Sequence, residues 1–157
     1  MNFAEYSSPV GKLLLCSDGS HLTGVRFGRE LPKAPEEDGV LKAAKMWLDS
    51  YFRGEFREPD FPILPEGTVF QKQVWQLLRQ IPRGQTVTYG HLARQISDRM
   101  SPQAVGQAVG KNPLAIIIPC HRCIGAVGKL TGYAWGIETK QWLLEHEQKG
   151  STQQWAL

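Results

Sequence analysis

The sequence contains little of what an exported or membrane-spanning protein needs. Among its 157 residues there are only three cysteines, and no apolar run is long enough to cross a bilayer. The chain does not start with a basic segment followed by an apolar one, so no secretory signal is predicted. An odd number of cysteines also argues against a disulfide framework. These absences predict a reducing compartment, the cytoplasm of a bacterium or the cytosol or nucleus of a eukaryote, and no membrane partner.

Acidic side chains are almost missing from one half of the chain. Residues 68–133 hold 8 lysines and arginines but a single acid, Asp98, which gives this segment a charge of +7, whereas residues 1–67 have a charge of −3. A basic segment of this kind is typical of a surface that binds a polyanion, although a solvated basic face has the same composition. Charge alone leaves DNA, RNA and an acidic protein open as partners. The candidate contacts are Lys72, Arg79, Arg83, Arg94, Arg99, Lys111, Arg122 and Lys129.

The first part of the chain mixes strand and helix signals. In residues 1–29 apolar stretches alternate with turn signals, which predicts two or three antiparallel strands. Residues 40–53 have apolar positions at helical spacing. Residues 54–67 contain three prolines and predict an extended linker. We therefore expect residues 1–67 to form a small antiparallel-sheet and helix module that includes its linker.

Helical signals dominate the rest of the chain. Thr68 is placed to cap a helix, and Thr88 and Ser101 are placed to cap two short helices within residues 88–111. Two short helices in the basic half resemble a helix-turn-helix. The predicted fold is thus α/β in the broad sense, of the α+β kind: the N-terminal module, then a mostly helical domain over residues 68–157.

A triple isoleucine leads to the most reactive side chain. Ile116–Ile118 are all β-branched, which predicts a short strand buried on both faces and ended by Pro119. The chain then presents Cys120 and His121 in an exposed turn. A neighbouring imidazole favours the nucleophilic thiolate, and because adjacent side chains point apart, His121 could act through a water. A structural, inert cysteine fits these residues equally well.

Other interpretations of the cysteines are weaker. Cys120 and Cys123 form a C-x-x-C pattern, but the residues after it begin a helix poorly, which disfavours a thiol oxidoreductase. Cys16 and His21 lie near each other, but no second pair is spaced to complete a zinc site. A papain-like hydrolase would need a remote base such as His91 or His146 and a larger chain.

Three long segments, together with residues 6–28, resemble one family. They are FQKQVWQLLRQIPRGQTVTYGHLA from residue 70, AVGQAVGKNPLAIIIPCHR from residue 104 and GKLTGYAWGIETKQWLLEHE from residue 128. This text is similar to the catalytic domain of O6-alkylguanine-DNA alkyltransferases of the ogt type, which repair DNA. The resemblance implies that an alkylated guanine of duplex DNA is flipped out and transfers its alkyl group, mainly methyl, to the cysteine. It implies one turnover, no cofactor and no metal, and a monomer that can cluster on DNA.

The resemblance also implies a role for each matching residue. The thiol of Cys120 attacks, His121 relays its proton through a water, and Glu147 polarises the imidazole. Asn112, which could equally be an ordinary helix stop before Pro113, would order the turn that carries the thiol. Tyr89 would assist flipping and donate a proton to the leaving guanine. The substrate pocket would include Tyr133, Ala134, Trp135 and Pro119. Contacts to DNA, made through the minor groove, would come from Gln103, Ala104, Gly106, Lys111, Arg122, Thr88 and Arg94.

Two positions depart from the family's pattern. Gln103 stands where the family normally has an arginine that fills the gap left by the flipped base, which predicts weaker DNA binding. Trp135 stands where a small residue is common, which predicts better handling of methyl than of benzyl adducts. The rival interpretation is a non-catalytic alkyltransferase-like lesion-binding protein, but such proteins replace the cysteine that is present here as Cys120. Half of a transcriptional regulator is disfavoured because no further domain or cysteine cluster accompanies it.

Overall fold

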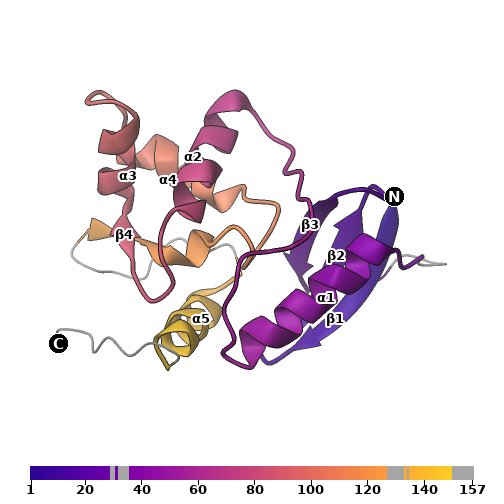
Figure 1. Cartoon of the computed structure of the whole chain (residues 1–157). Helices are drawn as coiled ribbons and strands as arrows, with labels where there is room; N and C mark the ends of the chain where they lie inside the picture. The colour runs from indigo at the N-terminus through magenta and orange to yellow at the C-terminus, as the bar shows by residue number, and fades with distance from the viewer. Residues whose placement is uncertain (29–30, 32–35, 127–132, 134, 150–157) are drawn as a thin grey trace.

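The computed structural model describes residues 1–28, 31, 36–126, 133 and 135–149, and places a sheet with one helix beside a group of shorter helices (Figure 1). Strands β1 (Asn2–Ser8), β2 (Gly11–Ser17) and β3 (Leu22–Phe27) form an antiparallel sheet in that order. Helix α1 (Gly39–Phe52) crosses one face of this sheet (Figure 1). The strands and the helix expected in the first part of the chain are therefore confirmed.

The packing of α1 on the sheet follows from its sequence spacing. Leu41, Ala44 and Leu48 recur on one helical face, are fully buried and join the apolar cluster of the sheet. Asp38 begins the helix, because its Oδ1 atom accepts a hydrogen bond of 2.8 Å from the Leu41 amide. Its second oxygen accepts from the Ser17 hydroxyl at 2.7 Å, so the cap also ties α1 to β2.

The remaining elements are mostly short helices. They are α2 (Val69–Arg79), β4 (Val87–Thr88), α3 (Tyr89–Ile96), α4 (Pro102–Gly110), the 3-10 turn η1 (Cys120–Arg122), β5 (Cys123–Ile124) and α5 (Ile137–Lys149). The hydroxyls of Thr68, Thr88 and Ser101 accept hydrogen bonds from the first turns of α2, α3 and α4, which confirms all three predicted caps. α3 and α4 form the helix-turn-helix. None of the described helices is long and apolar enough to span a bilayer.

The free edge of β3 holds two segments from elsewhere in the chain. Leu22 forms a parallel bridge with Ile63 of the linker, and Val25 forms one with Leu114, which precedes the cysteine. The amide of Val25 donates to the carbonyl of Pro113 at 2.9 Å. The sheet of the N-terminal module thereby fixes the start of the segment that leads to Cys120.

The strand expected over Ile116–Ile118 is not formed. These residues make a tight turn, in which the Ile118 amide donates to the Leu114 carbonyl at 2.9 Å. Ile116 adopts a φ of 71°, a left-handed value that costs a β-branched residue free energy. All three side chains are buried, so burial in the core holds the turn. Apolar, β-branched composition predicted the burial correctly but not the backbone path.

Candidate active site

Cys120 begins η1, directly after Pro119, and lies inside the protein rather than in the exposed turn that was expected. Its exposed fraction is 2%. Burial raises the pKa of the Cys120 thiol to about 11, although Asn112 and Tyr133 act in the opposite direction. The thiol is thus protonated at neutral pH in the protein alone, and a nearby base has to take its proton before it can attack.

Asn112 holds the turn that carries the thiol. Its buried side-chain amide donates to the carbonyl of Ile118 at 2.8 Å, and its Oδ1 atom accepts from the amide of Leu114 at 3.0 Å. One side chain therefore bridges both ends of the triple-isoleucine turn. Asn112 also lies just after the end of α4, where its backbone amide donates to the carbonyl of Val109 at 3.2 Å, so its position fits both roles considered for it.

His121 and Glu147 form a buried pair behind the cysteine. The Nε2 atom of His121 lies 2.6 Å from Oε2 of Glu147, and both side chains are fully buried. Burial alone would raise the pKa of Glu147, but His121 and Arg122 outweigh it and hold that pKa well below its ordinary value. The other imidazole nitrogen, Nδ1, is buried and makes no hydrogen bond within the described residues.

Arg122 does not lie where a DNA contact was expected. Its Nε and Nη2 atoms donate to the two carboxylate oxygens of Glu147 at 2.8 and 3.0 Å, and Nη1 donates to the carbonyl of Ile81 at 2.7 Å. Only 13% of the side chain is exposed. Arg122 is therefore corrected from a DNA contact to the ion-pair partner of Glu147. The composition of the basic segment could not reveal this, because the partner lies 25 residues further along the chain.

Aromatic rings and a lysine surround the cysteine. Burial, together with the thiols of Cys123 and Cys120, raises the pKa of Tyr89 to about 12. Burial and Cys120 also raise the pKa of Tyr133 well above its ordinary value. Lys140 is fully buried, its Nζ donates to the carbonyl of Cys123 at 2.6 Å, and it lies 6.0 Å from the ring centres of Tyr89 and Tyr133. Both tyrosines are therefore protonated at neutral pH.

Sequence reasoning missed two residues of this site. Lys140 shares the spacing of Leu143 and Glu147, so helical periodicity would have placed it on the buried face of α5. Tyr51 of α1 donates its hydroxyl to Oε2 of Glu147 at 2.7 Å. No sequence signal links Tyr51 to Glu147, because the two are 96 positions apart and belong to different parts of the fold.

Two other predicted pocket residues, Trp135 and Pro119, lie within the described part of the chain. The ring of Trp135 lies 5.2 Å from that of Phe27 and 5.4 Å from that of Tyr133. Pro119 borders a cavity of about 450 Å³ whose wall also includes Tyr51 and Arg122 but not Cys120. Ala134 and Lys129 lie outside the described residues.

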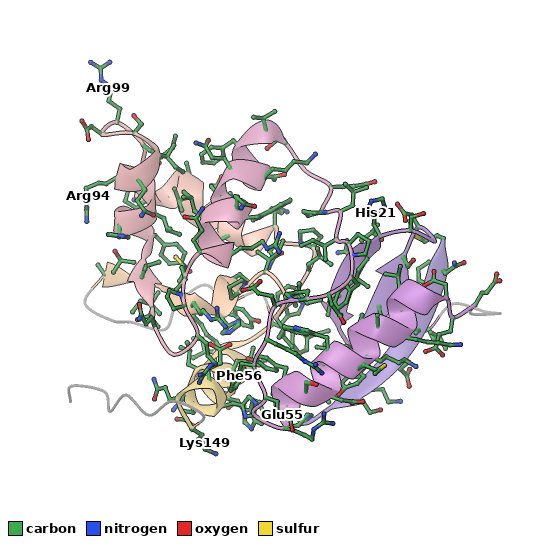
Figure 2. All side chains as sticks on the ribbon, viewed as in Figure 1. His21, Glu55, Phe56, Arg94, Arg99 and Lys149 are labelled. Atoms are coloured by element: carbon green, nitrogen blue, oxygen red, sulfur yellow. The ribbon has the colours of Figure 1, made fainter. Side chains whose placement is uncertain are left out.

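The helix-turn-helix carries most of the predicted DNA contacts. Gln103 and Lys111 are exposed, and Ala104 and Gly106 are half-buried, on or directly after α4. A Cβ atom at Gly106 would lie 3.8 Å from the Tyr89 ring, so α4 runs close to α3 here. Figure 2 shows the side chains of Arg94 and Arg99 extending outward from α3 and the turn after it. Thr88 caps α3, so its hydroxyl is engaged with the His91 amide.

The alternative cysteine chemistries find little support. Cys120 and Cys123 are free thiols within a 3-10 turn and a short strand, not at the start of an α-helix. Cys16 is also a free thiol, and the Nδ1 atom of His21 lies 3.3 Å from Oδ2 of Asp18. In the part of the chain that the structure describes, no group of three or more His, Cys, Asp or Glu side chains is placed to hold a metal ion.

The fold and the site together define a class of protein. A buried thiol that is followed by an imidazole-carboxylate pair is the arrangement of proteins that use cysteine as a nucleophile. The models of two protein families match most of the chain. "6-O-methylguanine DNA methyltransferase, ribonuclease-like domain" matches residues 1–65, and "6-O-methylguanine DNA methyltransferase, DNA binding domain" matches residues 69–149. The chain belongs to the 6-O-methylguanine DNA methyltransferase family.

Relatives and solved structures agree with this assignment. A methylated-DNA–protein-cysteine methyltransferase of Methanosarcina acetivorans is 44% identical over 153 residues, which cover 94% of this chain and 98% of that relative. The protein of the same name from Mycobacterium tuberculosis is 43% identical over 152 residues, with coverages of 94% and 92%. The crystal structure of Mycobacterium tuberculosis OGT in complex with DNA matches with a TM-score of 0.87 at 42% identity, and the match covers 96% of this chain and 95% of that one. The predicted family and fold class are thereby confirmed.

Proposed function

We propose that this chain repairs DNA by direct reversal, moving an alkyl group, mainly methyl, from the O6 atom of guanine onto Cys120. As a member of its family the chain is a methylated-DNA–protein-cysteine methyltransferase and binds DNA. The assignment to Cys120 rests on the residue that follows it: His121 is buried, and its Nε2 atom lies 2.6 Å from Oε2 of Glu147. O4-alkylthymine is proposed as a second substrate of the same chemistry.

The proposed reaction is a single displacement. His121 accepts the thiol proton through a water, and the resulting imidazolium is stabilised by Glu147. The sulfur of Cys120 then forms a bond to the alkyl carbon while the bond from that carbon to the guanine oxygen breaks. Tyr89, protonated because burial raises its pKa to about 12, donates a proton toward the guanine. The thioether is not reversed, so each protein molecule reacts once and no cofactor takes part.

The mass of the intact protein tests this proposal. The protein is incubated with an equal amount of duplex that contains one O6-methylguanine, and we expect a gain equal to one methyl group in place of one hydrogen. An unmethylated duplex of the same sequence is the control. Binding to the methylated duplex without any mass gain would contradict the proposal and favour a protein that only recognises the lesion.

The way in which DNA is held is also proposed. The exposed and half-buried side of α4, with Gln103, Ala104 and Gly106, is proposed to enter the minor groove, where small residues allow close approach. The damaged base is flipped out of the stack, since its alkyl carbon is out of reach in the duplex.

The protein is proposed to act as a monomer that can cluster on DNA, and to work in the cytoplasm. Residues 1–67 and 68–157 are proposed as its two domains.

Replacing Gln103 with arginine should tighten binding to DNA. Gln103 is exposed at the second position of α4, and a guanidinium there would add a charge and a planar donor. We expect binding to methylated duplex to become roughly tenfold tighter, the worth of one charge-assisted hydrogen bond. Fluorescence anisotropy at fixed salt measures the effect. Gln73→Arg on α2 adds the same charge outside the helix-turn-helix, and equal gains in both variants would contradict a special role for position 103.

Replacing Trp135 with glycine should widen the range of adducts that are accepted. The indole packs against the rings of Phe27 and Tyr133, and Tyr133 in turn acts on the thiol of Cys120. We expect the wild type to react faster with methyl than with benzyl adducts, and Trp135→Gly to raise the relative rate for benzyl roughly tenfold, as pocket-size effects usually do. Single-turnover rates with both duplexes give this ratio. An unchanged ratio would show that the indole does not limit the pocket.

A further inference from the structure

Tyr51 brings a side chain of the N-terminal module into the hydrogen-bond network of the reactive site. It lies in the last turn of α1 and is 2% exposed. Its hydroxyl donates to Oε2 of Glu147 at 2.7 Å, the same oxygen that lies 2.6 Å from Nε2 of His121. Nη2 of Arg122 donates to this oxygen as well, at 3.0 Å. Three groups therefore share one acceptor atom, and loss of the Tyr51 hydrogen bond changes the strength of the other two.

The position of Tyr51 is fixed from several sides. Its backbone carbonyl accepts a hydrogen bond from Nε2 of His146 at 2.6 Å, which ties the end of α1 to α5. Its ring also contacts those of Trp47, Phe52 and Phe56, with centres 5.1 to 5.6 Å apart. In Figure 1 the C-terminal end of α1 indeed lies beside α5. The hydroxyl is consequently aimed at Glu147 by packing that does not depend on Glu147 itself.

Several charged or titratable groups face this carboxylate. Arg122 and His121 come from η1, and Arg83, from the loop after α2, donates to the backbone carbonyl of Glu147 at 2.9 Å. Burial is the main reason that the pKa of Tyr133 is raised, and the charges of Cys120, Tyr51 and, least of all, Glu147 act in the same direction. On α5 itself, His146 precedes Glu147 and bonds to the carbonyl of Tyr51, and Lys140 lies on the buried face of the helix. Among the partners of the carboxylate oxygens within the described residues, Tyr51 is the one that comes from the N-terminal module.

We propose that Tyr51 is a positioning residue that limits the basicity of Glu147 and thereby sets the pH range in which His121 can take the proton of Cys120. A donor on a carboxylate oxygen draws electron density away from it and makes it a weaker acceptor for the imidazole. The N-terminal module is then part of the reactive site and not only a support for it. This inference rests on the proposed function, since it concerns the proton relay of that reaction.

The variant Tyr51→Phe removes the hydroxyl and keeps the ring. Glu147 retains His121 and Arg122 as partners, so the carboxylate is not left uncompensated. Because the carboxylate becomes a stronger acceptor, the imidazolium form is favoured, and transfer begins at higher pH. We expect the midpoint of the acidic limb of the single-turnover rate profile to move up by roughly half a pH unit, as the loss of one hydrogen bond predicts.

A matched control is available in the same module. Tyr6 also donates its hydroxyl to a carboxylate, that of Asp49, at 2.7 Å, but the pair is exposed. Tyr6→Phe should leave the midpoint unchanged. Replacement of Tyr51 by 3-fluorotyrosine, a more acidic phenol and a stronger donor, should move the midpoint in the opposite direction, and it remains informative if Tyr51→Phe folds poorly.

A second measurement needs no DNA and no transfer. Nitrogen NMR of the His121 ring across pH reports directly how readily the imidazole takes a proton, and its midpoint should rise in Tyr51→Phe. If the wild type takes up no methyl, the proposed function fails, while this titration still tests the contact of Tyr51. If the wild type is methylated but neither midpoint moves in either Tyr51 variant, the role of Tyr51 is overturned and the proposed function stands.

Discussion

Cys120→Ala takes up no methyl group from a duplex that contains O6-methylguanine, whereas the wild type gains one. The expected loss is complete, because the sulfur is the atom to which the new bond forms, and alanine offers no substitute. The measurement is the mass of the intact protein after incubation with an equal amount of the duplex. Binding of the variant to DNA should persist, since Cys120 is buried and lies outside the helix-turn-helix.

The other cysteines provide the matched control for this experiment. Cys123 is buried next to the site, and burial raises the pKa of its thiol to about 12. Cys16 lies in β2, and burial raises the pKa of its thiol as well. Neither thiol is followed by an imidazole-carboxylate pair, so Cys123→Ala and Cys16→Ala should still be methylated. A methyl group found on either of them in Cys120→Ala would contradict the assignment of the acceptor.

Local sequence rules predicted those features that depend on neighbouring residues. Thr68, Thr88 and Ser101 cap helices because a hydroxyl at that position reaches an amide two or three residues further on. A long stretch of matching residues predicted the family, which the comparisons confirm. Such features need no knowledge of distant contacts, which is why the sequence was sufficient for them.

Features that depend on distant contacts were predicted less well. Ile116 takes a left-handed backbone conformation, and burial in the surrounding core and the side-chain amide of Asn112 help to hold that turn in place. Arg122 contributes to the charge of the basic segment but is used internally by Glu147. Tyr51 reaches the same carboxylate from another part of the fold. Composition and periodicity describe residues that are close in the sequence, so they cannot predict contacts between side chains that are far apart in the chain. The structure is needed to find these contacts.

The pairing of Glu147 also determines how stability depends on pH. The pKa of Glu147 in the folded protein lies well below 4.5, its ordinary value, so the unfolded chain binds this proton at higher pH than the folded chain does. The resulting stabilisation is fully present above about pH 5. It is lost progressively as the pH falls below the ordinary value toward the folded one. Removal of the carboxylate should therefore matter most at neutral pH.

Glu147→Gln should impair both stability and transfer. The variant leaves the guanidinium of Arg122 buried without its anion, which typically costs about 3–5 kcal/mol. It also removes the charge that stabilises the imidazolium of His121, so the transfer rate should fall by roughly 100-fold or more. Urea unfolding at neutral pH and near pH 4, together with single-turnover rates, measures the two effects. We expect the difference in stability from the wild type to shrink at the lower pH.

Glu145→Gln is the matched control, because Glu145 is exposed on the same helix and its carboxylate accepts only from Gln141 among the described side chains. This variant should change neither the transfer rate nor the pH dependence of stability. If Glu147→Gln kept the wild-type pH dependence, the buried ion pair would not be the source of the acid sensitivity. If it kept the wild-type transfer rate, His121 would not need its carboxylate, and the thiol proton of Cys120 would have to leave by a route that does not pass through this pair.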